Sequence, residues 1–205
     1  ADRIIALPNG TSKYITSDSA RYFVHRMRSE YDAVLIGRNT ALKDDPLLDA
    51  RLAGRRSPVR IVVDEDLSLP GKLRIFNDEN SDRTTVITSR SAKPGRQYPN
   101  VKKIYARKSA SGLKIESILD AAWQEGISSI LVEGGAGLFS SFIASQLFDD
   151  IYFVIAPKII GKGLSAFGDF EIRRLADAYR LALDKHYITE SNELIVRYKN
   201  VYGNS

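Results

Sequence analysis

Short apolar runs rich in β-branched residues alternate with helical segments through the first two-thirds of this chain. The runs that we predict to be strands occupy 32–37, 59–63, 84–88, 101–105 and 129–133. Apolar residues at helical spacing mark the segments 17–30, 115–125 and 138–147. Strands that alternate with helices are typical of crossovers between parallel strands, so this order predicts a parallel sheet flanked by helices.

The last quarter of the chain follows a different pattern. Apolar runs at 148–156, 179–189 and 193–198 alternate as strands do, and only residues 190–192 separate the last two. Because a link this short joins antiparallel neighbours, we expect an antiparallel C-terminal hairpin. The predicted fold is α/β with a mixed, mostly parallel sheet, and 1–205 is expected to form a single domain.

The composition narrows the classes of function. Cysteine is absent and only two histidines occur, so we expect no metal site. No apolar run approaches the ~20 residues of a membrane helix, and the first residues do not have the pattern of a signal peptide. We therefore expect a cytoplasmic protein with no membrane partner. The net charge of +5 is dispersed, which suits a phosphorylated small molecule better than nucleic acid.

Residues 130–139 place a buried strand, two glycines and a helix start in direct succession. Glu133 stands at the carboxyl end of the strand, where open α/β sheets bind their ligands. Gly134 and Gly135 let the backbone approach a ligand closely, and free N–H groups at the helix start favour phosphate. An ordinary strand–turn–helix crossover is the alternative. The segment lacks the G-x-G-x-x-G spacing of a Rossmann dinucleotide site.

Other residues have side chains that suit a phosphorylated ligand. Arg38 and Thr40 offer a cation and a hydroxyl at a helix start, although simple capping also explains Thr40. Arg28 and Arg51 are either a bidentate phosphate clamp or solvated surface residues. The Asp-Asp-Pro sequence at 44–46 is either an acid/base site or a turn.

Six motifs, taken together and in order, indicate a family. They occupy 10–17, 32–37, 40–48, 58–64, 132–135 and 155–161. On these motifs the chain resembles the reductase domain of the bacterial bifunctional riboflavin-biosynthesis deaminase/reductase, and the resemblance implies a dihydrofolate-reductase-like fold. It covers about Asp2 to Tyr198. Compared with that family, the zinc deaminase domain and the start of the first strand are missing. The chain is therefore either a C-terminal domain of a longer protein, which we expect, or a stand-alone reductase.

The resemblance also implies an activity. The chain would be an NADPH-dependent oxidoreductase of riboflavin biosynthesis, a 5-amino-6-(5-phosphoribosylamino)uracil reductase that reduces the ribosyl C1′ to a ribityl chain. Its partner would be this phosphorylated aminouracil, and a homodimer or other homo-oligomer is expected. Two alternatives are a dihydrofolate-type pteridine reductase, for which Asp18 is a poorly matched acid, and a non-catalytic nucleotide-binding module.

Site residues carry over from the family by position. The substrate-binding positions are Ser12, Arg28, Leu48, Arg51 and Glu133. The NADPH positions are Tyr14, Thr40, Asp44 and the segment 135–141, which includes Gly135, Ala136, Gly137 and Leu138. Tyr14 replaces the tryptophan common in the family, and Glu65 replaces a smaller polar residue.

Three further predictions concern the chemistry of the site. Arg38, Ser89 and Arg90 are expected to reach the 2′-phosphate of NADPH, which predicts a preference for NADPH over NADH. Asp44 is a candidate catalytic acid, with Lys158 and water as the alternatives. The likeness of the glycine turn to that of dihydrofolate reductase predicts a cis peptide bond between residues 134 and 135.

Overall fold

A computed structural model describes residues 4–9, 15–93, 98, 101–110, 112–168 and 171–201. The chain forms two compact units, which are described separately. The central unit is His25–Leu138, and the terminal unit comprises the described residues up to Val24 and from Phe139 onward. The division falls inside two helices, α1 (Asp18–Glu30) and α4 (Ala136–Ala144).

The central unit is built on a five-stranded sheet in the order β5-β4-β3-β2-β8, in which every described ladder is parallel. Its strands are β2 (Ala33–Gly37), β3 (Val59–Val63), β4 (Thr84–Ser89), β5 (Lys102–Ala106) and β8 (Ile130–Val132). All five begin and end within a few residues of the predicted runs. The predicted parallel centre is confirmed.

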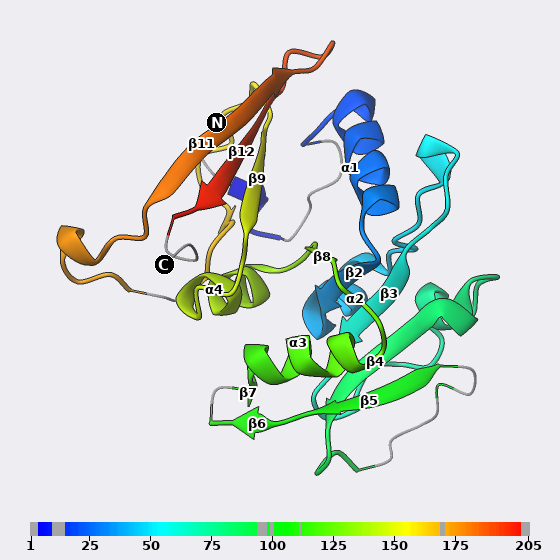
Figure 1. Ribbon diagram of the computed structural model, residues 1–205. Coiled ribbons are helices and arrows are strands. Elements are labelled where there is room, and N and C mark those ends of the chain that lie inside the picture. The colour runs from blue at the N-terminus through cyan, green and yellow to red at the C-terminus, as the bar shows by residue number, and fades with distance from the viewer. Residues whose placement is uncertain are drawn as a thin grey trace. The chain divides into compact units, whose positions relative to one another are not determined.

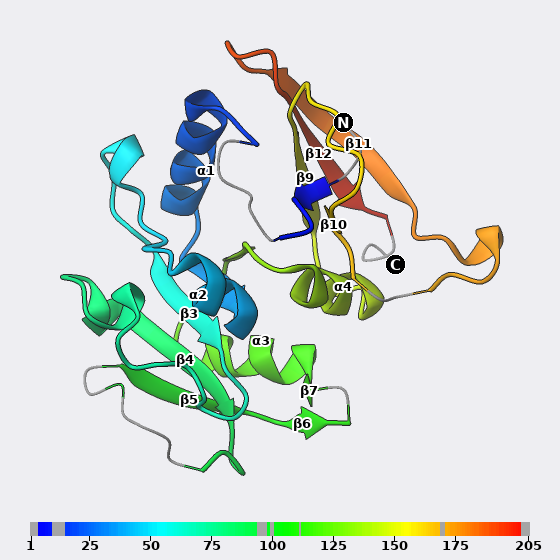
Figure 2. The same ribbon diagram turned by 180° about the vertical axis from the view of Figure 1, so that it is seen from behind.

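Helices cover both faces of this sheet. Helix α2 (Arg38–Asp44) connects β2 to β3, and α3 (Ile115–Gln124) leads from β5 toward β8 at the other edge. Figure 1 shows α3 in front of the strands, and the reverse view in Figure 2 brings α2 forward. Residues 33–36 of β2 are therefore all buried, as expected for a strand covered on both faces.

Arg60 is charged and stands in the middle of β3, yet it is 1% exposed. Its guanidinium donates to both carboxylate oxygens of Asp78 at 2.6 and 2.8 Å and to Thr84 Oγ1 at 2.7 and 3.0 Å. It also donates to the backbone carbonyl oxygens of Leu47, Ile75 and Asn80. These bonds compensate the cost of burying the charge and tie two long connections to the sheet.

The remaining short elements of the central unit lie in its connections. The 3-10 turns are η1 (Arg51–Ala53), η2 (Arg74–Phe76) and η3 (Ser81–Arg83). A small hairpin pairs β6 (Lys108–Ser109) with β7 (Gly112–Leu113). The sequence did not predict this hairpin, because two-residue strands are too short to show alternation.

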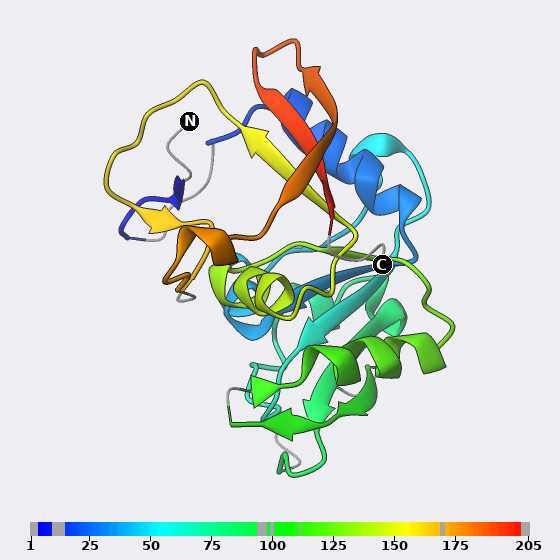
Figure 3. The ribbon, with the colours of Figure 1, turned by 60° about the vertical axis from the view of Figure 1, so that its left-hand side comes forward.

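The terminal unit contains the antiparallel part of the fold. Its strands β9 (Asp150–Ile155), β11 (Leu181–Ile188) and β12 (Leu194–Asn200) form a sheet in the order β11-β12-β9, which is labelled in Figure 1. Figure 3 shows the same strands from a second direction, in yellow, orange and red. The predicted C-terminal hairpin is confirmed. Among the described residues no ladder joins these three strands to the parallel sheet.

Two further contacts organise the terminal unit. The first is the antiparallel pairing of β1 (Ile4–Ala6) with β10 (Leu164–Ser165). A 3-10 turn, η4 (Leu175–Asp177), lies between β10 and β11. The second contact is made by a buried carboxylate. Buried Glu193 at the hairpin accepts hydrogen bonds from the N–H and the hydroxyl of Ser17, at 2.6 and 2.5 Å. Ser17 Oγ also accepts from the N–H of Ala20 at 3.3 Å, so Ser17 is the N-cap predicted for the first helix.

Candidate active site

The carboxyl ends of the parallel strands meet at one edge of the central sheet. β2 ends at Gly37, which lies opposite Val63 of β3, and Glu133 continues β8 by donating its N–H to the Leu35 carbonyl at 2.9 Å. Ser89 ends β4. Most of the predicted site residues of the central unit therefore follow strand ends at this edge, where open α/β sheets bind ligands.

The glycine turn after β8 lies directly against helix α2. A Cβ built on Gly134 would stand 3.0 Å from Thr40 Oγ1 and 3.3 Å from Ile36 Cγ2, and one on Gly135 would stand 3.1 Å from Thr40 Oγ1. Gly135 also has a φ of +72°, in the left-handed region that favours glycine. Both glycines are therefore required by close approach, and the turn places Thr40 beside the start of α4.

The predicted cis peptide bond between Gly134 and Gly135 is wrong, because no described peptide bond is cis. Three neighbouring positions were also predicted to bind cofactor. Ala136 begins α4, and Leu138 packs near Gly37, because its Cβ lies 3.9 Å from a Cβ built on Gly37. A Cβ at Gly137 would meet no described atom within 4 Å.

Glu133 forms a bidentate ion pair with Arg28. Arg28 Nε and Nη2 donate to the two carboxylate oxygens of Glu133, each at 2.7 Å, and Nη1 donates to the backbone carbonyl of Asp49 at 3.0 Å. Burial by itself would lower the pKa of Arg28, but the hydrogen bond and charge of Glu133 outweigh it and raise that pKa. Arg28 and Glu133, predicted separately, therefore act as one structural group.

Asp49 connects this pair to Arg51. Its carboxylate accepts from Arg51 Nη1 at 2.5 Å, and its Oδ1 lies 3.5 Å from Nδ1 of buried His25. Burial, followed by the nearby Arg28 charge, lowers the pKa of His25. Neither Asp49 nor His25 was predicted to be a site residue. Their positions relative to Arg28 are set by tertiary packing, which no local pattern shows.

The segment from Asp44 to Asp49 has an unusual backbone. Asp45 and Leu48 adopt φ values of +40° and +54°, which side chains other than glycine rarely do. Asp45 Oδ1 accepts from the N–H of Arg74 at 2.7 Å. Leu48, predicted to bind substrate, is 3% exposed and packs in the core, so its side chain is not presented to a ligand in this structure.

Asp44 itself remains at the surface at the end of α2. Partial desolvation raises the pKa of its carboxyl group, against the opposing effect of Lys43. A raised pKa favours retention of a proton, which is the property required of a general acid.

A second polar cluster surrounds Asp64, immediately after β3. Asp64 is fully buried and accepts hydrogen bonds from the Tyr98 hydroxyl and the Leu69 N–H, each at 2.9 Å. Burial, with the neighbouring Asp64 charge, raises the pKa of Tyr98. Arg38 Nε lies 4.0 Å from Asp64 Oδ1 while half of the Arg38 side chain stays exposed. Asp64 therefore restrains the cation that we predicted for the 2′-phosphate.

The end of β4 carries Ser89 and Arg90. Ser89 is buried, donates its N–H to the Glu65 carbonyl at 3.1 Å and shares a 2.8 Å hydroxyl contact with Ser91. The Arg90 guanidinium stands 5.3 Å from the ring centroid of Tyr105. Glu65 itself forms an ion pair with Lys108 of the β6–β7 hairpin.

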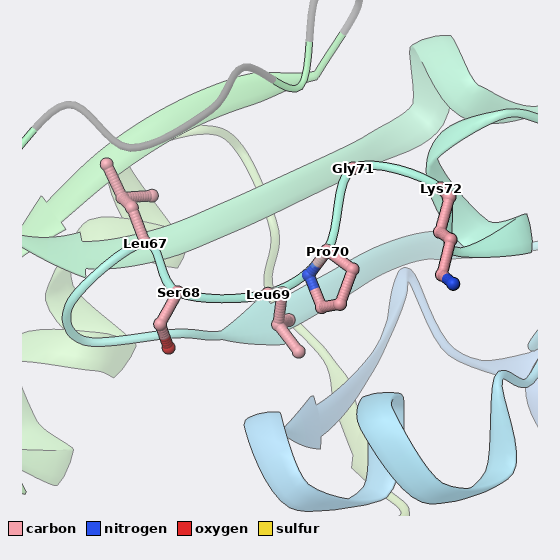
Figure 4. A pocket seen from close by; sticks show the side chains of 6 residues that line it. All are labelled: Leu67, Ser68, Leu69, Pro70, Gly71 and Lys72. Carbon is pink, nitrogen blue, oxygen red and sulfur yellow. The ribbon is translucent and has the colours of Figure 1, made fainter.

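The remaining predicted positions lie elsewhere. Ser12 and Tyr14 fall outside the described residues. Lys158 belongs to the terminal unit, where its Nζ donates to the Ile15 carbonyl at 3.0 Å. Figure 4 shows a hollow formed by residues 67–72 on the loop after β3, which contains none of the predicted site residues.

Two other features, a metal-binding cluster and a membrane-spanning helix, are not found among the described residues. No group of three or more His, Cys, Asp or Glu side chains there is arranged to hold a metal ion. No helix in this part of the chain is long and apolar enough to span a membrane.

The sequence matches one known protein family over most of its length. The model of the RibD C-terminal domain family matches residues 1–193. This chain belongs to that family. The match spans both units and includes every predicted site residue.

Relatives of the RibD C-terminal domain include full-length proteins of two kinds. The chain is 34% identical over 185 residues to the riboflavin biosynthesis protein RibD of Aquifex aeolicus, covering 90% of this chain and 51% of that protein. It is 35% identical over 205 residues to the 2,5-diamino-6-ribosylamino-4(3H)-pyrimidinone 5′-phosphate reductase of Methanothermobacter thermautotrophicus, covering 96% and 92%. The chain thus spans about half the length of the RibD proteins that it matches.

A solved structure of the same family confirms the fold class. The chain superposes with a TM-score of 0.80 on the Thermotoga maritima diaminohydroxyphosphoribosylaminopyrimidine deaminase/5-amino-6-(5-phosphoribosylamino)uracil reductase. The two are 36% identical, and the match covers 97% of this chain and 53% of that one. The predicted dihydrofolate-reductase-like α/β fold is therefore confirmed for this member of the RibD C-terminal domain family.

Proposed function

We propose that this chain is an NADPH-dependent reductase of 5-amino-6-(5-phosphoribosylamino)uracil that acts in riboflavin biosynthesis. One observation carries the proposal beyond family membership. Glu133 belongs to the ion cluster with Arg28 and Asp49, and the next two residues form the glycine turn against Thr40. A single turn therefore joins a charged cluster suited to a phosphorylated sugar with a glycine segment suited to a dinucleotide.

The residues present fit a nicotinamide cofactor. Gly134 and Gly135 leave room at the start of α4, and Thr40 offers a hydroxyl beside them. Arg38, with its side chain half exposed, is a cation that can bind a 2′-phosphate, and exposed Arg90, directly after β4, is a second. Ser89 is buried and shares its hydroxyl with Ser91, so it is less suited to contact that phosphate. When bound, NADPH supplies the hydride that converts the ribosyl C1′ into the ribityl carbon.

The chain's own residues have three tasks in this reaction. Arg51 is exposed and binds the substrate phosphate, because a guanidinium presents a planar fork of donors. Arg28 holds Glu133 in one orientation toward the substrate. Hydride addition also requires one proton, and Asp44, whose carboxyl pKa is raised by desolvation, is the residue that we assign as its donor.

The substrate assay decides this proposal. Under anaerobic conditions, the chain is mixed with NADPH and freshly deaminated substrate, and loss of nicotinamide absorbance is followed. We expect turnover that depends on the phosphorylated aminouracil. Binding of NADPH without turnover would favour a non-catalytic nucleotide-binding module, and turnover with a pterin instead would favour a pteridine reductase.

A second substrate is favoured by one relative. The Methanothermobacter protein, 92% of which is covered, is named for the 2,5-diamino pyrimidinone and not for the deaminated uracil. The same assay with the diamino compound tests this candidate. The substrate with the larger kcat/KM is the one that the site selects, since specificity is a ratio of these values.

Arg51→Lys tests the phosphate assignment. Lysine keeps the positive charge but lacks the fork, so we expect a higher KM and a lower turnover with the phosphorylated substrate. NADPH affinity, measured by fluorescence, should hardly change. Loss of NADPH binding with normal substrate kinetics would place Arg51 in the cofactor site instead.

A further inference from the structure

Asp49 contacts both arginines of the substrate cluster through different atoms. Its backbone carbonyl accepts from Arg28 Nη1 at 3.0 Å, and its carboxylate accepts from Arg51 Nη1 at 2.5 Å. The Asp49 side chain is 13% exposed, whereas that of Arg51 is 59% exposed. One end of this ion pair is therefore held inside the cluster while the other faces solvent.

This arrangement leaves part of the Arg51 guanidinium available. Within the part of the chain that the structure describes, Asp49 is its hydrogen-bond partner, through Nη1. The Nε and Nη2 groups retain their donors for a ligand. A long arginine side chain loses rotamer freedom when it binds, and a carboxylate that already restrains it removes part of that loss.

We propose that Asp49 is the positioning residue for the substrate phosphate, acting by orienting Arg51. Asp49 carries a negative charge, so it does not attract the phosphate itself. Its contribution is to hold the guanidinium in the direction that a phosphate dianion requires. The proposal rests on the proposed function, because it takes Arg51 as the cation that binds the phosphate.

His25 provides a spectroscopic probe of this site. Its Nδ1 lies 3.5 Å from Asp49 Oδ1, and the charges facing it are those of Arg28, Asp49, Arg51 and Glu133. The chain has two histidines, and the second, His186, lies on β11 of the terminal unit. The ring resonances of His25 report on the cluster, and those of His186 serve as an internal reference.

Ribose 5-phosphate is the probe ligand, with ribose as the uncharged comparison. Binding of each ligand is followed by NMR through the His25 ring resonance, which is assigned by its loss in His25→Gln. The proteins compared are the wild type, Asp49→Ala, Asp49→Asn and Arg51→Ala. Asp120→Asn is the matched control, because it removes the same charge from an exposed carboxylate on α3. NADPH binding and the His186 resonance show that each variant is folded.

We expect Asp49→Ala to weaken ribose 5-phosphate binding about tenfold or more, approaching the effect of Arg51→Ala. Asp49→Asn should weaken it less, by about threefold, because a neutral acceptor keeps a weaker hydrogen bond to Arg51. Asp120→Asn and binding of ribose should show no change. In the ligand-free protein, Asp49→Asn should also lower the pKa of His25, since the Asp49 charge raises it.

Wild-type affinity for ribose 5-phosphate in both Asp49 variants would overturn the positioning role. Absence of any phosphate-dependent effect on His25 in the wild type would overturn it as well. Failure of the proposed function is a separate result, because it appears as lack of turnover by the wild type with NADPH and the aminouracil. An active wild type with unaffected Asp49 variants would refute this inference alone.

Discussion

Replacement of Gly135 by alanine tests whether the glycine turn after β8 is required by its geometry. The residue has a φ of +72°, where an L side chain costs ~1–2 kcal/mol. Its new Cβ would lie 3.1 Å from Thr40 Oγ1, the one non-neighbouring atom of the described chain within 4 Å. Relief of that contact by a small rotation of the Thr40 side chain adds about 0.5 kcal/mol. We expect a total loss of about 2 kcal/mol in the free energy of unfolding.

Urea unfolding measures this loss as a lower midpoint at an unchanged slope. The double variant Thr40→Ala/Gly135→Ala should recover only the contact part, about 0.5 kcal/mol, because the backbone conformation remains unfavourable. Gly137→Ala is the matched control. It stands two residues further on, in α4, with no described atom within 4 Å of its Cβ, so alanine there should be neutral or stabilising by up to about 1 kcal/mol.

Equal midpoints for the wild type and Gly135→Ala would refute the argument. So would a loss for Gly137→Ala as large as that for Gly135→Ala, because the penalty would then come from the added methyl group in general.

Three other predictions concern charged residues. Arg28→Met should lower the free energy of unfolding, measured in urea, by about 2–4 kcal/mol, because it leaves the Glu133 carboxylate, 19% exposed, without its partner. The control Arg26→Met, which removes an exposed i,i+4 ion pair, should change the free energy of unfolding little. Arg38→Ala should raise the Kd for NADPH roughly ten- to a hundredfold and leave the Kd for NADH unchanged. Equal effects on the two Kd values would contradict a contact between Arg38 and the 2′-phosphate. Burial lowers the pKa of His25 below its usual 6.5, so the unfolded chain binds the proton first as pH falls. The wild type should therefore lose stability below about pH 6.5, and His25→Gln should show a smaller loss over the same range, measured by urea midpoints.

The sequence was sufficient for the elements that are long or strongly patterned. The five parallel strands, the helix capped by Ser17 and the C-terminal hairpin were predicted, because apolar period and turn length are local properties. The strand–glycine–helix order at 130–139 was predicted for the same reason. The two-residue strands β6, β7 and β10 were missed, since their pairing depends on tertiary contacts.

Within the candidate site, residue types were easier to predict than their partners. Arg28 and Glu133 were both named, but their bidentate pairing joins positions 105 residues apart, and no spacing rule connects them. Asp49 and Asp64 were not named, because a single aspartate in a loop is indistinguishable from a turn residue until its neighbours are known. The cis peptide was predicted by analogy, and no described peptide bond is cis.

In the proposed function Arg51 must be both oriented and exposed, and the composition of the cluster meets this requirement. A surface arginine alone is mobile and binds phosphate weakly, so it needs a carboxylate to restrain it, which Asp49 provides. That carboxylate must itself be held, and Arg28 holds the Asp49 backbone. Arg28, only 14% exposed, would be a costly buried cation without Glu133. Two carboxylates thus balance two guanidinium groups, and the cluster gains fixed geometry in place of a large net positive charge.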